Sequence, residues 1–255
     1  MALNRAIHFG TSWGSGNNIA LDSGFTTATP PYLTTSPVFG MSGTSTANVF
    51  FVIDFAANAS GSGATFGTVA DQFTGLTWTR HGPSRNFQST AGGSFPWITL
   101  ERWWAFGATG ITAGNVTAVI TGGTSVDGGA AIMYAFTGVN VSSLPTSAWD
   151  ANASLQGTAN GTATAPTIAS ISTTNTNTCL LMSAAATHTS GGIYSAQTAV
   201  SPFTNIVNAG MSYGTNDGEL SMEYVIKSTS TSGLSAQMGT TWDGWLALID
   251  ALVSA

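Results

Sequence analysis

Charge is the scarcest feature of this 255-residue sequence, because only 6% of its residues are Asp, Glu, Lys or Arg. An ordinary soluble domain has about 25%. So few charges exclude a coiled coil and a long solvated helix, which both need charged faces. Five Lys and Arg residues against eleven Asp and Glu residues give a net charge of −6. Because a phosphate backbone would be repelled, we expect no nucleic-acid partner.

Cysteine and long apolar runs are also scarce. The single cysteine, Cys179, excludes an intramolecular disulfide, and its apolar neighbours predict a buried, inert thiol. The longest apolar runs, Val49–Ala57 and Trp245–Val253, are each broken by an Asp and are far shorter than the roughly 18 residues of a membrane span. Met1–Trp13 has no apolar stretch of the kind that a signal peptide needs. We therefore expect neither membrane insertion nor export.

Strand patterns dominate what is present. Hydrophobic residues make up 43% of the chain, and alternating or β-branched runs are separated by Gly, Asn, Ser and Pro turns. The expected strands are Asn48–Phe55, Gly75–His81, Trp97–Phe106, Asn115–Thr121, Ala130–Thr137, Thr167–Ile171, Thr178–Ala186, Ile193–Val200, Glu219–Ser228, Leu234–Thr240 and Trp245–Val253. About eleven strands predict an all-β fold, a two-sheet antiparallel sandwich of jelly-roll type.

The sequence divides into an N-terminal segment and one domain. Residues 1–46, rich in Gly, Asn, Thr and Pro, are expected to form an extended arm or an edge-covering segment, and residues 47–255 a single β-sandwich. Gly157–Pro166 reads as a flexible connection between two halves of the sandwich. Ser147–Leu155 has the pattern of one or two helical turns. As a strand, Trp245–Val253 would present apolar residues on both faces. This pattern favours a doubly buried strand over a helix capped at Asp243.

No catalytic motif is strong. Gly10–Gly14 matches the G-x-S-x-G nucleophile elbow, but the elbow needs a parallel sheet that the pattern does not predict. His8, His81 and His188 are isolated, so each is expected in a strand or loop with one hydrogen bond. We expect no catalytic residue, and therefore not an enzyme.

Glu219–Glu223 is the carboxylate pair of greatest interest, since both glutamates face one side of a strand. The segment resembles the E-x-D-x-E strand of laminarinase-like glycoside hydrolases, with Ser221 in place of the central Asp. The resemblance implies Glu219 as nucleophile and Glu223 as acid/base. Their backbones would lie about 13 Å apart, whereas retaining chemistry needs carboxyl groups about 5–5.5 Å apart. The expected turn at Asn216–Gly218 predicts an exposed Glu219.

The residues that could bind a metal or a sugar are also explained by turns and by core packing. Asp127–Gly129 and Asn216–Gly218 offer oxygen ligands, but no complete calcium loop is present, so we expect no metal and no cofactor. Eight tryptophans suggest a sugar-binding surface. Trp103 and Trp104 must point to opposite faces of their strand, so we expect most tryptophans in the core and one or two at an interface or glycan site.

The order of strands in Asn48–Asn140 and Asp243–Val253 resembles phage-encoded and bacterial surface β-sandwich proteins. The resemblance implies a jelly-roll or concanavalin-A-like sandwich displayed on a particle or cell surface. Together with the low content of charged residues and the lack of a signal-peptide pattern, the resemblance predicts a non-enzymatic virion structural protein. More specifically, it predicts a bacteriophage capsid decoration protein made in a host cytoplasm. Its partners would be the major capsid protein or other virion subunits, and it would form a homo-oligomer such as a trimer. A carbohydrate-binding or adhesin module and a laminarinase-like hydrolase are the alternatives.

Overall fold

Every regular element in the described part of the chain is a β-strand. The computed structural model describes residues 17–22, 27–28, 38–41, 45–72, 76–90, 93–110, 114–122, 126–187, 196–213 and 216–255. Within these ranges seventeen strands form four sheets, and all strand pairs are antiparallel. The all-β antiparallel class is therefore confirmed, but the strands are more numerous than the eleven expected.

Two large sheets form the centre of the molecule. The seven-stranded sheet has the order β1 (Ala20–Leu21), β10 (Val126–Thr137), β4 (Val49–Ala59), β8 (Trp97–Gly107) and β6 (Thr79–Arg80), with β2 (Thr27–Ala28) also on β10 and β7 (Arg85–Gln88) also on β8. The five-stranded sheet has the order β11 (Gly157–Thr164), β17 (Trp242–Val253), β13 (Thr178–Thr187), β15 (Asn216–Lys227) and β14 (Asn205–Tyr213).

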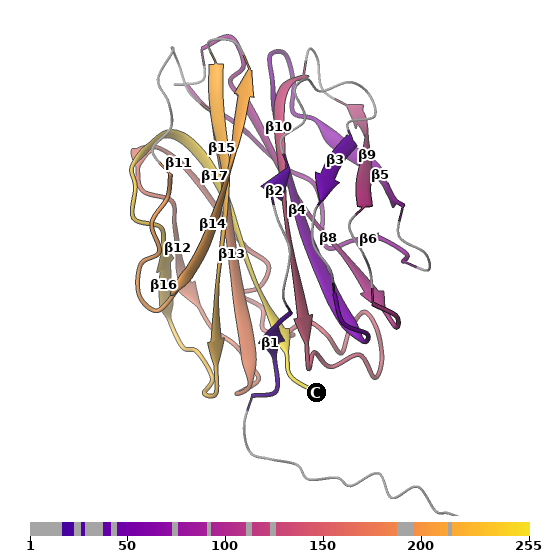
Figure 1. Cartoon of the computed structure of the whole chain (residues 1–255). Helices are drawn as coiled ribbons and strands as arrows, with labels where there is room; N and C mark the ends of the chain where they lie inside the picture. The colour runs from indigo at the N-terminus through magenta and orange to yellow at the C-terminus, as the bar shows by residue number, and fades with distance from the viewer. Residues whose placement is uncertain are drawn as a thin grey trace, which may run out of the picture.

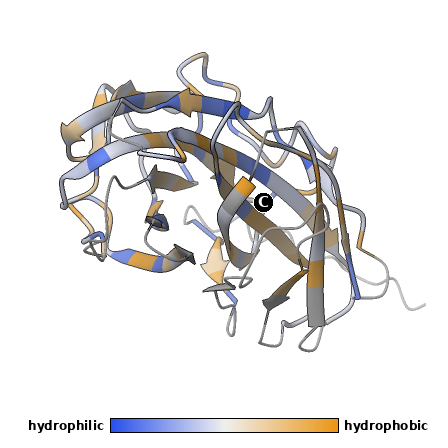
Figure 2. Ribbon diagram, turned by 90° about the horizontal axis from the view of Figure 1, so that it is seen from above, coloured by the Kyte–Doolittle hydropathy of each residue, from blue (hydrophilic) through white to orange (hydrophobic). Residues whose placement is uncertain are grey.

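Two small sheets cover the outer faces of the large ones. The first consists of β3 (Val38–Met41), β9 (Gly114–Gly122) and β5 (Thr65–Asp71), and it lies beside the seven-stranded sheet (Figure 1). The second, β12 (Thr167–Ile171) and β16 (Leu234–Gln237), lies beside the five-stranded sheet on the opposite side of the molecule (Figure 1). The sandwich is thus four layers deep, and Figure 2 shows its curved strands from above.

Three apolar clusters fill the spaces between these layers. Phe50 and Val52 of β4 pack in the central cluster between the large sheets, while Phe51 and Ile53 pack in the outer cluster under β3, β5 and β9. A third cluster lies between the five-stranded sheet and the β12–β16 sheet. Because β4, β13 and β17 sit between two clusters, they are apolar on both faces, as parallel-sheet strands usually are. The predicted double burial of the last strand is confirmed.

The two halves of the chain repeat one strand arrangement. In the first half β4 lies between β8 and β10 while β3 pairs with β9, and in the second half β13 lies between β15 and β17 while β12 pairs with β16. The next strand outward also corresponds, because β2 pairs with β10 and β11 pairs with β17. Asp127-Gly128 and Asp243-Gly244 occupy the same second and third positions of the equivalent strands β10 and β17. The central cluster is therefore an interface between two similar halves.

Several local expectations were wrong. Residues 157–164 are not a flexible connection but the strand β11, which pairs with β17 from Gly157 to Thr164. Of Ile193–Val200, the described residues 196–200 contain only an isolated bridge between Ala199 and Met238. Ser147–Leu155 contains turns and no helix. In each case pairing or packing with distant residues decided the backbone, and local propensity carried no information about those partners.

The described pieces of the N-terminal segment lie against the sandwich. Ala20 and Leu21 pair with the end of β10, and Val38–Met41 pair with β9. Asn17 donates its side-chain amide to the carbonyl oxygens of Thr178 and Lys227, which joins the segment to the five-stranded sheet. The division of the chain at residue 46 stays a prediction.

Candidate functional site

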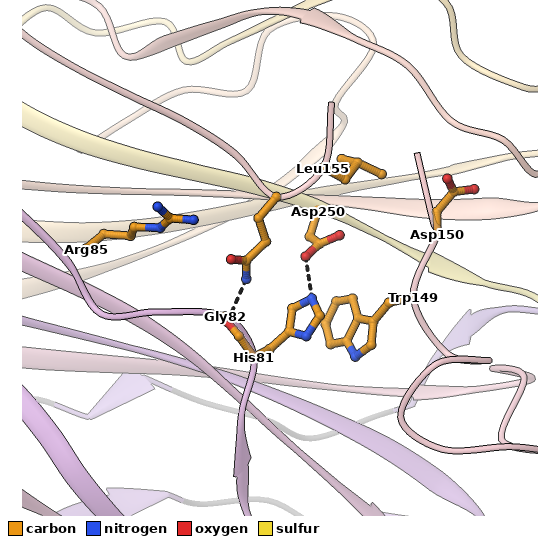
Figure 3. A pocket seen from close by; sticks show the side chains of 8 residues that line it. His81, Gly82, Arg85, Trp149, Asp150, Leu155 and Asp250 are labelled. Atoms are coloured by element: carbon orange, nitrogen blue, oxygen red, sulfur yellow. Dashed lines mark hydrogen bonds and ion pairs between the residues drawn. The ribbon is translucent and has the colours of Figure 1, made fainter. Parts of the chain in front are cut away.

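A pocket of about 370 Å³ opens at one side of the central interface, where the two large sheets meet. The chain leaves β6 at Arg80 and places His81, Gly82 and, at the start of β7, Arg85 on one wall. The segment after the isolated Trp149–Leu252 bridge supplies the opposite wall, and β17 supplies the base. The lining residues are His81, Gly82, Arg85, Trp149, Asp150, Leu155, Gln156 and Asp250 (Figure 3).

His81 is held on three sides. Its Nε2 lies 2.6 Å from Oδ2 of Asp250, and its ring stacks on Trp149 with centroids 3.8 Å apart and planes 11° apart. Its carbonyl oxygen accepts a 2.6 Å hydrogen bond from the Gln156 side chain. The expected side-chain hydrogen bond of His81 is confirmed, although its partner lies 169 positions away. Among the described residues, no serine, threonine or cysteine lines this pocket, so none of them offers a nucleophile to the His–Asp pair.

Asp150 fastens the wall of the pocket rather than facing a ligand. Its Oδ1 accepts hydrogen bonds from the backbone N–H groups of Asn152 and Thr174, and its Oδ2 accepts two from Asn175. Burial alone would raise the pKa of Asp150, but these hydrogen bonds lower it below its usual value. The ionised carboxylate therefore holds the loop in place.

Two lining residues have a side-chain N–H that is shielded from solvent and has no partner among the described residues, namely Arg85 at Nε and Trp149 at Nε1. The backbone of Arg85 pairs with Leu100 of β8, but no hydrogen bond or ion pair joins its side chain to another described residue. Arg80 and Arg102, by contrast, lie beside Glu101 and Asp54. The guanidinium of Arg85 thus brings unused hydrogen-bond donors to the pocket.

A second polar cluster is closed off inside the central interface. Arg102 donates from Nε and Nη2 to the two carboxylate oxygens of Asp54 at 2.9 and 2.8 Å, and from Nη2 to Ser183 Oγ at 3.0 Å. Its Nη1 donates to the Leu181 carbonyl at 3.3 Å. Burial alone would lower the pKa of Arg102, but the adjacent Asp54 and the nearby Asp250 raise it. The guanidinium therefore stays charged and joins the two large sheets.

The two glutamates singled out from the sequence lie away from the pocket. Glu219 is only 4% exposed and Glu223 is fully buried, so the expectation of an exposed Glu219 was wrong. Residues 216–218 begin β15 instead of forming a turn, and pairing with β13 and β14 buries the strand. Glu219 accepts a hydrogen bond from Ser221, whereas neither carboxylate oxygen of Glu223 has a partner among the residues that the structure describes. A sugar chain has no access to Glu223 in this structure.

Tryptophan is mostly a core residue in this protein. Six of the eight tryptophans are buried, namely Trp78, Trp103, Trp104, Trp149, Trp242 and Trp245. Trp103 and Trp104 belong to different clusters on opposite faces of β8, as their adjacency predicted. These six rings offer no exposed face on which a sugar could stack.

Other sequence candidates fall at or outside the limits of the described residues. His8, His188 and Gly10–Gly14 lie outside them. Asp127 and Asp217 lie in β10 and β15, but their side chains are not described. Among the residues that the structure covers, no three His, Cys, Asp or Glu side chains are grouped to hold a metal, and no helix is long and apolar enough to cross a membrane.

Cys179 is fully buried, and burial raises the pKa of its thiol well above the ordinary value. We expect a thiol reagent at pH 8 to label the folded protein about a hundredfold more slowly than the protein in denaturant. Absorbance of the released chromophore measures both rates. A Cys179→Ala variant gives the background, and fast labelling of the folded protein would contradict the burial.

Asp250 and Arg85 stand in no sequence motif, so their membership of a site was not predicted from the sequence. The only available signal was their rarity, because acidic and basic residues are so few in this chain.

Comparison with protein-family models, with curated proteins and with solved structures found no match for this chain.

Proposed function

We propose that the protein is a non-enzymatic structural subunit of a virus particle, a capsid decoration protein that binds the shell and holds neighbouring subunits together. The observation that carries the proposal is the lack of charge at the edges of the five-stranded sheet. Neither terminal strand, β11 (GTANGTAT) or β14 (NIVNAGMSY), contains an Asp, Glu, Lys or Arg. Monomeric β proteins commonly protect such edges with charge, especially lysine.

An uncharged edge is suited to contact with another subunit. Hydroxyl and amide groups form hydrogen bonds across an interface without the desolvation cost of buried ions. The whole chain follows the same rule, with 6% charged residues. The four packed layers make the subunit rigid. The resemblance of the sequence to phage surface β-sandwiches is the reason for proposing a virus particle as its location. The partners proposed are the major capsid protein and further copies of this chain.

Quantitative mass spectrometry of purified particles tests the proposal. We expect a high copy number in a fixed ratio to the major capsid protein, because a decoration protein occupies a repeated position on the shell. A few copies per particle would contradict the decoration role and indicate a tail or fibre component. Absence from particles would contradict the virion role altogether. Light scattering of the purified protein measures the oligomer that this function requires.

A further inference from the structure

The pocket around His81 has a mismatch between its donors and its acceptors. All the carboxylate acceptors in it are already engaged, while the side chain of Arg85 has no partner among the described residues and its shielded Nε–H is unpaired. We propose that this pocket is a binding site for the carboxylate group of a small organic acid, held by the guanidinium of Arg85. The inference is independent of the structural role proposed above.

The hydrogen bonds around the pocket occupy its acceptors and leave donors available. Asp150 accepts four hydrogen bonds, and Asp250 accepts one from the Ala251 N–H while its other oxygen lies against His81. Gln156 donates one side-chain N–H to the His81 carbonyl. The guanidinium of Arg85 has five N–H donors, and its Nε–H is shielded from solvent. The pocket therefore has more hydrogen-bond donors than acceptors available for a ligand.

Charge and shape select the carboxylate among acceptors. The planar guanidinium fork matches a carboxylate through two parallel hydrogen bonds. Asp150 and Asp250 already place negative charge in the walls, and among the described residues Arg85 is the only lining arginine or lysine. A carboxylate monoanion adds less repulsion with the two aspartates than a phosphate dianion does, so the single guanidinium fits a carboxylate better than a phosphate. The volume of about 370 Å³ lies at the small end of ligand pockets, which suits a molecule of metabolite size.

An NMR titration of the full-length protein tests the site directly. The Nε–H signal of Arg85 is observed while D-glucuronate and acetate are added separately, with D-glucose as the neutral counterpart of glucuronate and inorganic phosphate as the dianion. We expect a saturable shift with at least one carboxylate and none with glucose or phosphate. Acetate alone would indicate a general carboxylate site, and a stronger effect of glucuronate a sugar-acid site.

Matched variants show whether Arg85 carries the binding. Arg85→Gln should weaken binding of the carboxylate about tenfold or more, and Arg85→Lys, which keeps the charge but loses the fork, should weaken it less. Lys227→Gln removes the same charge from a residue that does not line the pocket, and it should leave the affinity unchanged. The proposal is overturned if neither carboxylate shifts the signal, if glucose binds as well as glucuronate, or if folded Arg85→Gln binds as tightly as the original protein.

Discussion

Replacing Asp54 with asparagine is expected to lower the free energy of unfolding by about 3–5 kcal/mol. Asp54 and Arg102 are both fully shielded from solvent. Each carboxylate oxygen of Asp54 accepts a hydrogen bond from the Arg102 guanidinium. The variant would leave Arg102 as an uncompensated buried charge in the middle of the central interface. Asparagine keeps one acceptor oxygen for the three donors of Arg102 and Ser183 that now share the two oxygens of Asp54, and its NH2 group would face one of those donors. Urea denaturation followed by tryptophan fluorescence measures the loss.

The double variant Asp54→Leu with Arg102→Met is the control for that experiment. It removes both charges and fills the site with apolar side chains, so it should be more stable than the Asp54→Asn single variant. A loss below about 1 kcal/mol in the single variant would show that the pair is not desolvated as the structure has it.

Replacing Glu223 with glutamine is expected to stabilise the protein at alkaline pH. Burial without any hydrogen bond raises the pKa of Glu223 from 4.5 to about 8. The folded protein therefore holds the proton more tightly than the unfolded chain does. The stability contributed by the protonated carboxyl is fully present below pH 4.5 and is lost as the pH rises through about 8. Glutamine stays neutral at every pH and avoids this loss.

At pH 9 we expect Glu223→Gln to be more stable than the original protein by on the order of 3 kcal/mol, and at pH 4 to be nearly equal to it. Urea denaturation at both pH values gives the two differences. Glu219→Gln is the matched control on the same strand. Burial also raises the pKa of Glu219, but hydrogen bonds from Ser221 and the Gln197 N–H oppose the shift, so its gain at pH 9 should be smaller. Equal stability of the Glu223→Gln variant and the original protein at pH 9 would contradict the burial of an unpaired carboxyl.

Local pattern predicted most long strands because a run of apolar, β-branched and aromatic residues is a property of the strand itself. Val49–Ala59, Trp97–Gly107, Thr178–Thr187 and Trp242–Val253 are found within a few residues of their expected positions. β11 was missed because GTANGTAT has no large apolar residue, and only its pairing with β17 makes it a strand. The repeat of the two halves was missed for a related reason, since it is kept in strand order and facing more than in residue identity.

The candidate site was less accessible to sequence reasoning than the fold. His81 was considered and its single hydrogen bond was expected, but Asp250 lies in an apolar strand and Arg85 in a short one. Their proximity depends on how the two large sheets pack at the central interface. No spacing in the sequence reports a contact between residues 169 positions apart.

Composition and strand periodicity act locally, so they were enough to predict the all-β class, the buried thiol of Cys179 and the opposite facing of Trp103 and Trp104. Which polar residues are paired depends instead on the three-dimensional packing of the two halves. This packing joined Arg102 to Asp54, left Glu223 without a partner among the described residues and opened the pocket beside Arg85. The physical reason is that the cost of burying a charge is fixed by what surrounds it in space, and in this protein those surroundings come from the opposite half of the chain.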